Sequence, residues 1–306
     1  MLLEDLQVIL KVAEFRSITA AAESLDMRMA TASAAIKRVE KSLGAELFIR
    51  TTRQLRLSPA GERYLPHCQQ ALQTLEQAKQ HLKADLDTIE GELRIAAPSD
   101  LGRNLILPWL DNFMEHHQGL SIKLHVSDSN IDFFRDPVDI AIRYGKPNDA
   151  NLYGFKICDV PRVICASPEY IQKHGSPTNL DQLSQHNGLL YQLHDILHDV
   201  WEFTQHEKPV KVRMQSNRAS NDAELVRRWC VAGKGLAAKS CLDMSDDLLN
   251  SRVKTVLPDY PPKSTELWLI CPSRQSITPA VRLLRDMLQQ QCLEILSKLK
   301  QQKVIA

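Results

Sequence analysis

Basic side chains are concentrated in one short stretch near the amino terminus of the 306-residue chain. Residues 28 to 58 contain seven basic and only two acidic side chains, a local excess of +5 in a chain whose net charge is +1. The basic residues are Arg28, Lys37, Arg38, Lys41, Arg50, Arg53 and Arg56. Such a cluster supplies the salt-dependent, sequence-independent part of affinity for nucleic acid. The charge pattern therefore favours a phosphate-binding surface.

Three short helices are predicted for the segment that carries these residues. The spacing of apolar residues indicates helices from Leu3 to Phe15, from Ile18 to Leu25 and from Met29 to Leu43. Ser17 is expected to cap the second helix. The small side chains of Ala20–Ala22 let the second and third helices cross closely. This pattern fits a helix-turn-helix, whose last helix enters a major groove.

A β-wing is predicted after the third helix, at residues 47–58. Its apolar residues anchor it, and Arg50, Arg53 and Arg56 are expected to face outward. On pattern alone, a small solvated helical bundle with a basic face is the alternative interpretation.

A long helix is predicted to follow. Ser58 and Pro59 form a helix start signal, and only Gly61 and Pro66 interrupt the chain before Gly91. An apolar stripe repeats at alternating steps of three and four residues, with Lys79 as its one interruption: Leu65, Cys68, Leu72, Leu75, Leu82, Leu86 and Ile89. Such a stripe favours pairing with a second copy of the helix. Packing of the helix on its own domain is the alternative.

From Gly91 onward, strand-like and helix-like segments alternate. Strands are predicted at 93–97, 121–126, 138–142, 163–165, 188–191, 211–214 and 267–270, and helices at 101–117, 131–135, 168–174, 222–232 and 278–299. Alternation of this kind predicts an α/β domain with a mostly parallel sheet. Ligands of such domains bind in a crevice at the ends of the strands.

Six short motifs lie along the first 61 residues of the chain. They are Val12–Glu14, Ser17–Leu25, Ala35–Glu40, Leu43–Gly44, Leu47–Arg50 and Leu57–Gly61. Together they closely resemble the winged helix-turn-helix of LysR-type transcriptional regulators. The resemblance implies that the first unit binds DNA.

The chain departs from this family where the recognition helix begins. The family usually has Ser-Gln-Pro-Ala where this chain has Arg28–Thr31, and Ala34 stands where an arginine is common. The residues predicted to contact DNA are Arg28, Met29, Ala30, Thr31, Ser33, Ala34, Lys37, Arg38, Arg50, Arg53 and Arg56. Because of these departures, fewer hydrogen-bonding side chains are available to read base edges than in the family pattern. The hypothesis is that the methyl-bearing residues contact thymine methyl groups, that Ser33 and the basic residues hold phosphates, and that DNA shape adds specificity.

The rest of the chain carries further motifs of the same family. They are Gly91–Ile95, Val138–Gly145, Arg162–Ile171, Ala223–Ala238 and Leu257–Tyr260. They resemble the effector-binding domain, so the resemblance covers nearly the whole chain. It implies a fold like that of a periplasmic binding protein, with two α/β lobes, two crossover strands and a cleft between the lobes.

The predicted organisation is an α/β chain with three parts. Residues 1–58 are expected to form the winged helix-turn-helix, 59–90 the linker and dimerisation helix, and 91–306 the effector-binding domain. Lobe I is placed at about 91–162 and 266–306, and lobe II at about 163–265.

Two helix starts and one strand end are predicted to line the cleft. The residues are Ser99, Asp100, Leu101, Arg143, Tyr144, Ser220 and Asn221. Free backbone N–H groups at helix starts suit carboxylates, which favours an anionic effector. The two serines could instead only cap their helices. Arg143 either binds the effector or pairs with Asp139.

Other reactive side chains form no recognisable site. The seven cysteines lack Cys-x-x-Cys spacing, so we expect reduced thiols rather than disulfides or a zinc site. Cys230 has basic neighbours that would suit a redox sensor, but a buried helix cysteine is favoured. His194 and His198 lack evident metal-binding partners, and a solvated loop is favoured for them. We find no catalytic motif and expect no enzyme activity, cofactor or metal.

The sequence thus predicts a ligand-responsive, sequence-specific regulator of transcription. Two alternatives are an enzyme or transport-type binding protein with an appended helical domain, and a nucleoid-like protein that binds DNA without selectivity. The expected partners are double-stranded DNA, a small-molecule effector and further copies of the chain, as a dimer through residues 59–90 or a tetramer. RNA polymerase is a further candidate.

The cytoplasm is the expected location. The first six residues lack the pattern of a signal peptide, and no uninterrupted apolar run reaches about 18 residues, so no membrane segment is expected.

Overall fold

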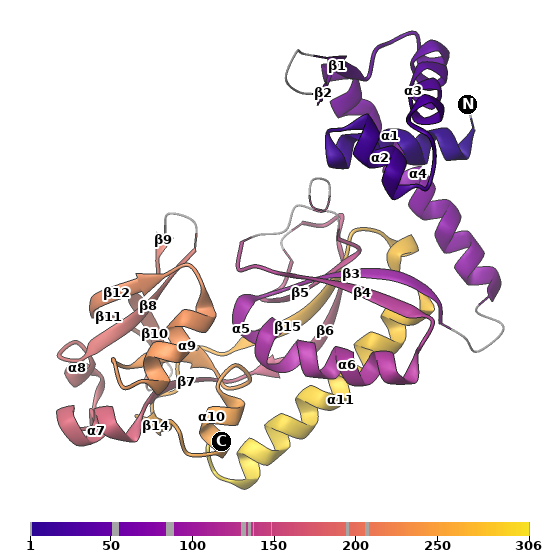
Figure 1. Cartoon of the computed structure of the whole chain (residues 1–306). Coiled ribbons are helices and arrows are strands. Elements are labelled where there is room, and N and C mark those ends of the chain that lie inside the picture. Colours follow the sequence, from indigo (N-terminus) through magenta and orange to yellow (C-terminus); the bar gives the residue numbers. More distant parts are fainter. Residues whose placement is uncertain are drawn as a thin grey trace. The chain divides into compact units, whose positions relative to one another are not determined.

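The computed structural model describes residues 2–50, 55–83, 89–129, 133, 136, 138–147, 149–193, 196–205 and 208–305. The side chains of residues 50, 73, 76–83 and 205 are not described. The chain forms two compact units, Met1–Leu86 and Asp87–Ala306 (Figure 1).

The first unit contains the three predicted helices, a two-stranded wing and a long helix (Figure 1). Its elements are α1 Leu3–Phe15, α2 Ile18–Ser24, α3 Met29–Leu43, β1 Phe48–Arg50, β2 Leu55–Leu57 and α4 Pro59–Lys83. Ser17 caps α2 as predicted, since its Oγ accepts a hydrogen bond from the Ala20 amide at 3.3 Å. Ala21 and Ala22 are buried between the helices, which explains why small residues are needed there.

A partly buried ion pair holds α1 against α3. Arg38 Nη2 donates to Asp5 Oδ1 at 2.5 Å, and Arg38 Nε donates to Asp5 Oδ2 at 3.3 Å. Asp5 is buried, whereas Arg38 remains half exposed. The hydrogen bonds from Arg38 lower the pKa of Asp5 below its ordinary value of 3.8, although burial opposes this. Arg38 therefore has a structural partner as well as a position on the basic surface.

The wing is fixed to the helices through backbone contacts. Glu40 Oε1 accepts hydrogen bonds from the amides of Leu47 at 2.8 Å and Phe48 at 3.3 Å. Ser58 Oγ accepts from the Gly61 amide at 3.0 Å and so caps the start of α4. A Cβ at Gly61 would lie 2.3 Å from the Leu47 carbonyl oxygen, so only glycine allows α4 to approach the wing this closely.

The apolar stripe of α4 serves two purposes. Leu65 and Cys68 are buried in the core of the first unit, and Leu72 packs against that core. The alternative of packing on its own domain is therefore correct for the first half of the helix. Leu75 is 46 % exposed and is free to meet a partner. The Leu82 side chain and Leu86 lie outside the described part, and Ile89 packs against the core of the second unit rather than extending the stripe.

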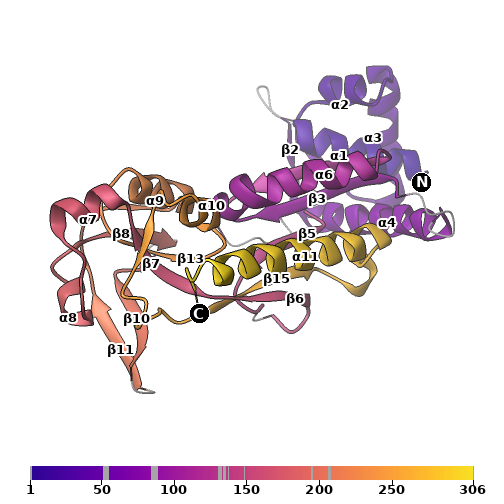
Figure 2. The same ribbon diagram turned by 90° about the horizontal axis from the view of Figure 1, so that it is seen from below.

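The second unit has two lobes (Figure 1). The first lobe is built on a five-stranded sheet in the order β4-β3-β5-β15-β6. Its strands are β3 Gly91–Ala97, β4 Leu120–Val126, β5 Ile140–Tyr144, β6 Tyr153–Val160 and β15 Thr265–Cys271. Its helices are α5 Ser99–Leu101, which continues through a π-helical turn at Gly102–Ile106 into α6 Leu107–His116, and α11 Pro279–Gln301. α6 and α11 lie on the same side of the sheet, below it in Figure 1 and in front of it in Figure 2.

The second lobe, on the left in Figure 1, contains shorter sheets. Its strands are β7 Arg162–Ala166, β8 Asn187–Leu193, β9 Ile196–Leu197, β10 Val200–Gln205, β11 Lys208–Arg213, β12 Gln215–Ser220, β13 Ala237–Ser240 and β14 Lys254–Val256. Its helices are α7 Pro168–His174, α8 Leu180–Leu183, α9 Ala223–Val231 and α10 Ser245–Leu249. β6 and β15 lead into and out of this lobe, so the chain crosses between the lobes twice.

The prediction of mostly parallel sheets is wrong. β3 is parallel to β4 and β5, and β8 is parallel to β12, but the other strand pairs described in the second unit are antiparallel. β15 runs antiparallel to both of its neighbours, β5 and β6, and β10 and β11 form a local hairpin. The predicted helix at 131–135 lies outside the described residues except for Phe133, which packs near Ala96 and Val138.

The Asp5–Arg38 pair predicts a pH-dependent stability of the first unit. Because the pKa of folded Asp5 is lowered, the pair stabilises the fold above pH 3.8, and this contribution is lost as the pH falls through the folded-state value. Arg38→Met should therefore speed the labelling of buried Cys68 by 4,4′-dithiodipyridine at pH 7. The difference in labelling rate between this variant and the unsubstituted protein should shrink below pH 4. Lys41→Met, which removes an exposed charge from the same helix, is the control. Equal effects of both substitutions would contradict the prediction.

Candidate functional site

The outer face of α3 carries the residues predicted to contact DNA. Arg28, at the start of the helix, and Met29, Ala30, Thr31, Ala34 and Lys37 are all exposed, and Ser33 is partly buried. Ala32, Ala35, Ile36 and Val39 form the buried face. The helical period therefore separates a packing face from a surface of methyl, hydroxyl and basic groups.

Met29 is held at this surface by a contact that the sequence did not indicate. The Thr19 hydroxyl of α2 donates to the Met29 sulfur at 3.5 Å, and Met29 is 56 % exposed. Thr19 therefore restrains one of the residues predicted to touch the bases.

Of the three wing arginines, the structure describes the side chain of Arg56. Arg56 is exposed on β2 and lies opposite Ile49 of β1. Arg50 ends β1, but its side chain is not described, and Arg53 lies outside the described residues. The structure therefore brings α3 and the two wing strands into one unit.

A cleft of about 590 Å³ lies between the lobes of the second unit. Asp100, Arg143 and Tyr144 line it, as predicted. Within the described chain, the residues lining this cleft do not include Ser99, Leu101, Ser220 or Asn221. Leu101 is buried in the core of the unit, and Asn221 is exposed.

Both predicted serines act within the protein. Ser220 Oγ accepts from the Asp222 amide at 3.0 Å, and Asp222 in turn caps α9. Ser99 Oγ donates to Asp128 Oδ2 and accepts from the Glu224 amide at 3.3 Å. Both serines therefore have partners within the protein, although neither is the N-cap residue of its own helix.

The start of α9 is already occupied by a carboxylate of the first lobe. Asp128 Oδ2 accepts from the Ala223 amide at 2.7 Å, and Asp128 Oδ1 accepts from the Ser99 amide at 2.7 Å. Free amides at a helix start attract negative charge, and here Asp128 satisfies them. An effector carboxylate therefore needs a different partner in the cleft.

Further polar contacts join the same edges of the lobes. Arg103 Nη1 lies 3.3 Å from Asp222 Oδ2, and Asn104 Nδ2 donates to Glu224 Oε2 at 2.6 Å. Arg227 Nη1 donates to Asn104 Oδ1 at 3.2 Å. The first helix of the first lobe is thus fixed to α9 of the second along one side of the cleft.

A buried cluster of charges forms part of the cleft wall. Lys239 Nζ makes an ion pair with Asp100, donates to the Ala223 carbonyl at 3.1 Å and lies 3.8 Å from Asp243 Oδ2. Burial opposes the charge, but Asp100 and Asp243 raise the pKa of Lys239, so its ammonium group stays protonated. Tyr144 donates to Asp243 Oδ1 at 2.6 Å, and burial raises the pKa of Tyr144 well above its ordinary value.

Two arginines provide positive charge in the cleft. Arg162 Nη2 donates to the Ala238 carbonyl at 3.2 Å. Within the described residues this is the one hydrogen bond of its guanidinium group, which leaves donors for a ligand. Burial lowers the pKa of Arg162, and Asp243 opposes this effect. Arg143 also lines the cleft. Asp139, the alternative partner considered for Arg143, accepts hydrogen bonds from the Arg94 amide and guanidinium group.

The sequence interpretation missed four charged residues of the cleft: Asp128, Arg162, Lys239 and Asp243. A lysine within the strand Ala237–Ser240, which otherwise has small side chains, was an available signal because a buried lysine needs a partner. Asp128 lies just past the end of β4, where ligand-binding residues of α/β sheets occur.

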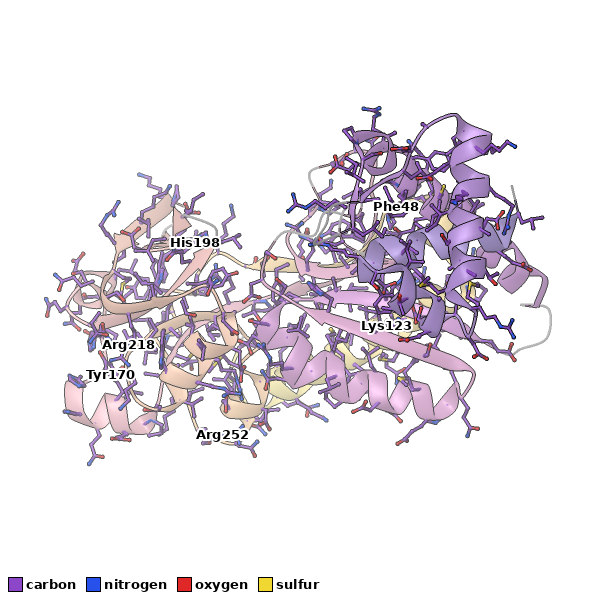
Figure 3. All side chains as sticks on the ribbon, turned by 45° about the horizontal axis from the view of Figure 1, so that its top comes forward. Phe48, Lys123, Tyr170, His198, Arg218 and Arg252 are labelled. Carbon is purple, nitrogen blue, oxygen red and sulfur yellow. The ribbon has the colours of Figure 1, made fainter. Side chains whose placement is uncertain are left out.

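His198 and Cys230, whose reactivity was considered from the sequence, both contact other residues of the protein. His198 lines the cleft from the second lobe (Figure 3) and stacks on Tyr191 at 5.9 Å between ring centroids. Its predicted neighbour His194 lies outside the described residues. Cys230 is fully buried, and its thiol donates to the Cys165 carbonyl at 3.4 Å, which favours a structural role over that of a sensor.

Comparison with protein families gives two matches. A family described as "Bacterial regulatory helix-turn-helix protein, lysR family" matches residues 3–62, and one described as "LysR substrate binding domain" matches residues 87–293. No described helix is both long and apolar enough to cross a membrane.

Individual relatives match along almost the entire chain. The chain is 32 % identical to the HTH-type transcriptional regulator DmlR of Escherichia coli. The match extends over 289 residues and covers 94 % of each chain. It is 30 % identical to the HTH-type transcriptional activator TtdR of the same species, over 88 % of this chain and 86 % of the relative.

Solved structures of full-length regulators share the fold. The structure of AphB, a virulence activator of Vibrio cholerae, matches with a TM-score of 0.57 and 27 % identity, over 94 % of this chain and 98 % of that one. CrgA of Neisseria meningitidis matches with a TM-score of 0.61 and 26 % identity, over the same shares of the two chains.

The surface of α3 predicts how substitutions alter DNA binding. Thr31→Val and Ala34→Ser should change which bases are preferred, because they exchange methyl and hydroxyl groups on the outward face. Lys37→Ala should instead weaken binding to all sequences alike and reduce the salt slope by about one. Selection from a randomised DNA library, with affinities measured at two salt concentrations, checks both. An unaltered preference in the first two variants would contradict the role given to this face.

Proposed function

The chain belongs to the LysR family of helix-turn-helix transcriptional regulators, and on this premise we propose that it binds operator DNA as a dimer or tetramer under the control of a small anionic effector. LysR regulators bind DNA and effectors and act in transcription rather than catalysis. We place the protein in the cytoplasm, where its DNA lies, with RNA polymerase as a candidate partner.

The observation that carries the DNA-binding proposal is the outward face of α3. Its exposed methyl, hydroxyl and basic groups project from a helix whose opposite face is fully packed. The Asp5–Arg38 pair and the Glu40 contacts hold this helix and the wing in a fixed relation. A rigid helix with such a surface suits insertion into a major groove.

Self-association is assigned to the second half of the linker helix in residues 59–90. Leu65 and Cys68 are used by the core of the first unit, so the pairing surface begins near the exposed Leu75. A symmetric dimer presents two copies of α3 to two half-sites of DNA. The expected operator is therefore an interrupted inverted repeat.

The effector is assigned to the cleft between lobe I, at about 91–162 and 266–306, and lobe II, at about 163–265. Asp128 already fills the start of α9, and Lys239 is neutralised by Asp100 and Asp243. Arg162 retains free donors beside the cleft, with Arg143 nearby in the lining. A planar guanidinium group binds a carboxylate with two parallel hydrogen bonds, which favours a small carboxylate as effector.

Selection of genomic fragments tests the proposal. The purified full-length protein is mixed with fragments of its source genome at moderate salt, and the bound fragments are sequenced. Enrichment of a few interrupted inverted repeats is the expected result. Leu75→Lys, which places a charge on the pairing surface, should lower the dimer fraction measured by light scattering and weaken this enrichment.

Uniform recovery of all fragments would contradict sequence-specific regulation and support a nucleoid-like role. Alanine substitution of Lys37 is the control for charge, because it should lower recovery without changing which fragments are enriched.

A further inference from the structure

Two cysteine side chains meet where α11 packs on β6 in the first lobe. α11 runs beside β6 and β15 (Figure 2). The Arg285 guanidinium group lies over the Phe155 ring, 5.3 Å from its centroid, and one turn later Gln289 Nε2 donates to the Lys156 carbonyl at 3.3 Å. These two contacts fix the position of the helix along the strand.

Cys292 and Cys158 lie just beyond these two contacts, on the helix and on the strand respectively. Cys292 lies three residues after Gln289, about 4.5 Å along the helix, and Cys158 lies two residues after Lys156, about 6.6 Å along the strand. The strand has a bulge at this point, opposite Leu267 and Trp268, which shortens its step. Cys158 packs against the core cluster that contains Cys292, and each of the two thiols shifts the pKa of the other.

The surroundings of the two thiols differ. Cys158 is partly exposed, whereas Cys292 is fully buried. The interaction with Cys292 lowers the pKa of the Cys158 thiol; burial and the neighbouring Asp159 oppose this shift, and Lys156 adds to it. The same interaction, together with burial, raises the pKa of Cys292. Cys158 is therefore the nucleophile of the pair, and Cys292 is its neutral partner.

The other close pair of thiols lacks this asymmetry. Cys165 and Cys230 lie 3.8 Å apart between β7 and α9, and both are fully buried. The hydrogen bond with Cys230 and burial raise the pKa of Cys165 well above its ordinary value. A peroxide in solution reaches neither thiol easily, and Cys165 is not poised as a thiolate.

We propose that Cys158 and Cys292 form a reversible dithiol switch that is oxidised by hydroperoxides. The Cys158 thiolate attacks the O–O bond of the hydroperoxide, which forms a sulfenic acid and releases an alcohol, or water from hydrogen peroxide. The Cys292 sulfur then attacks the sulfenic sulfur, and a second water leaves as the disulfide forms. In sum, two thiols are oxidised and one hydroperoxide is reduced.

The position of the pair connects its redox state with the crossing between the lobes. β6 ends at Val160, and the chain passes through Pro161 directly into β7 of the second lobe. The Pro161 carbonyl accepts a hydrogen bond from the Cys241 amide at 2.9 Å. A disulfide from β6 to α11 would fix the strand next to this crossing and restrict adjustment of the lobes around the cleft.

Peptide mapping of the oxidised protein tests the proposal. The reduced full-length protein is treated with hydrogen peroxide, its free thiols are blocked with iodoacetamide, and it is digested with trypsin without reductant. The expected product links the peptide 157–162 to the peptide 286–298 and has lost the mass of two hydrogen atoms. Dithiothreitol should restore both free peptides.

Variants separate the two steps. Cys292→Ser should prevent the disulfide and leave Cys158 as a sulfenic acid that dimedone traps. Cys271→Ser is the matched control, because Cys271 is fully buried and burial raises its pKa to about 12, so the disulfide should form as before. If Cys292→Ser does not fold, native alkylation of the unsubstituted protein gives an independent test. Cys158 should react more than about tenfold faster than Cys271, because reactivity follows the thiolate fraction.

Two results would overturn the proposal. One is that Cys158 and Cys292 remain free thiols after peroxide treatment. The other is that Cys165 and Cys230 form the disulfide first. Neither result bears on DNA binding, because the reduced protein carries the proposed regulatory function.

Discussion

The buried ammonium group of Lys239 is the interaction on which the second unit depends. Lys239 lies in the second lobe with 7 % of its surface exposed, and its ion pair is with Asp100 of the first lobe. A buried charge without a partner costs several kcal/mol, so separating the lobes at this point would leave Lys239 and Asp100 uncompensated. Asp243 and Tyr144 extend the same cluster across the cleft wall. The charges that join the lobes therefore also shape the cavity between them.

The same contacts decide where an effector binds. Asp128 provides a carboxylate at the start of α9, and Ser99 completes the contact, so this position is already satisfied from within the protein. Arg162 keeps guanidinium donors that no described residue uses, and Arg143 also lines the cleft. A carboxylate bound there would lie close to Asp243 and would change the balance of charge around Lys239. Binding in the cleft is in this way connected to the pairing of the lobes.

The sequence predicted features that depend on local pattern and missed those that depend on distant pairing. α1 to α3 and the Ser17 cap follow from helical period and capping chemistry, and they agree with the structure within a residue or two. The antiparallel crossover strands β6 and β15 were not recognised as such, because strand direction depends on partners more than 100 residues apart. Ser99 was predicted to bind the effector, but its partners Asp128 and Glu224 are set by the packing of two lobes. Local chemistry alone could not distinguish these roles.

Under the proposed function, occupancy of the cleft and binding of operator DNA are coupled, and thermodynamic linkage tests this coupling. Operator affinity is measured with and without a bound carboxylate, and carboxylate affinity is measured with and without operator. We expect the two affinities to change by the same factor. Arg162→Met should weaken carboxylate binding and leave the operator affinity of the carboxylate-free protein unchanged. Operator affinity that is identical with and without the bound carboxylate would contradict the coupling.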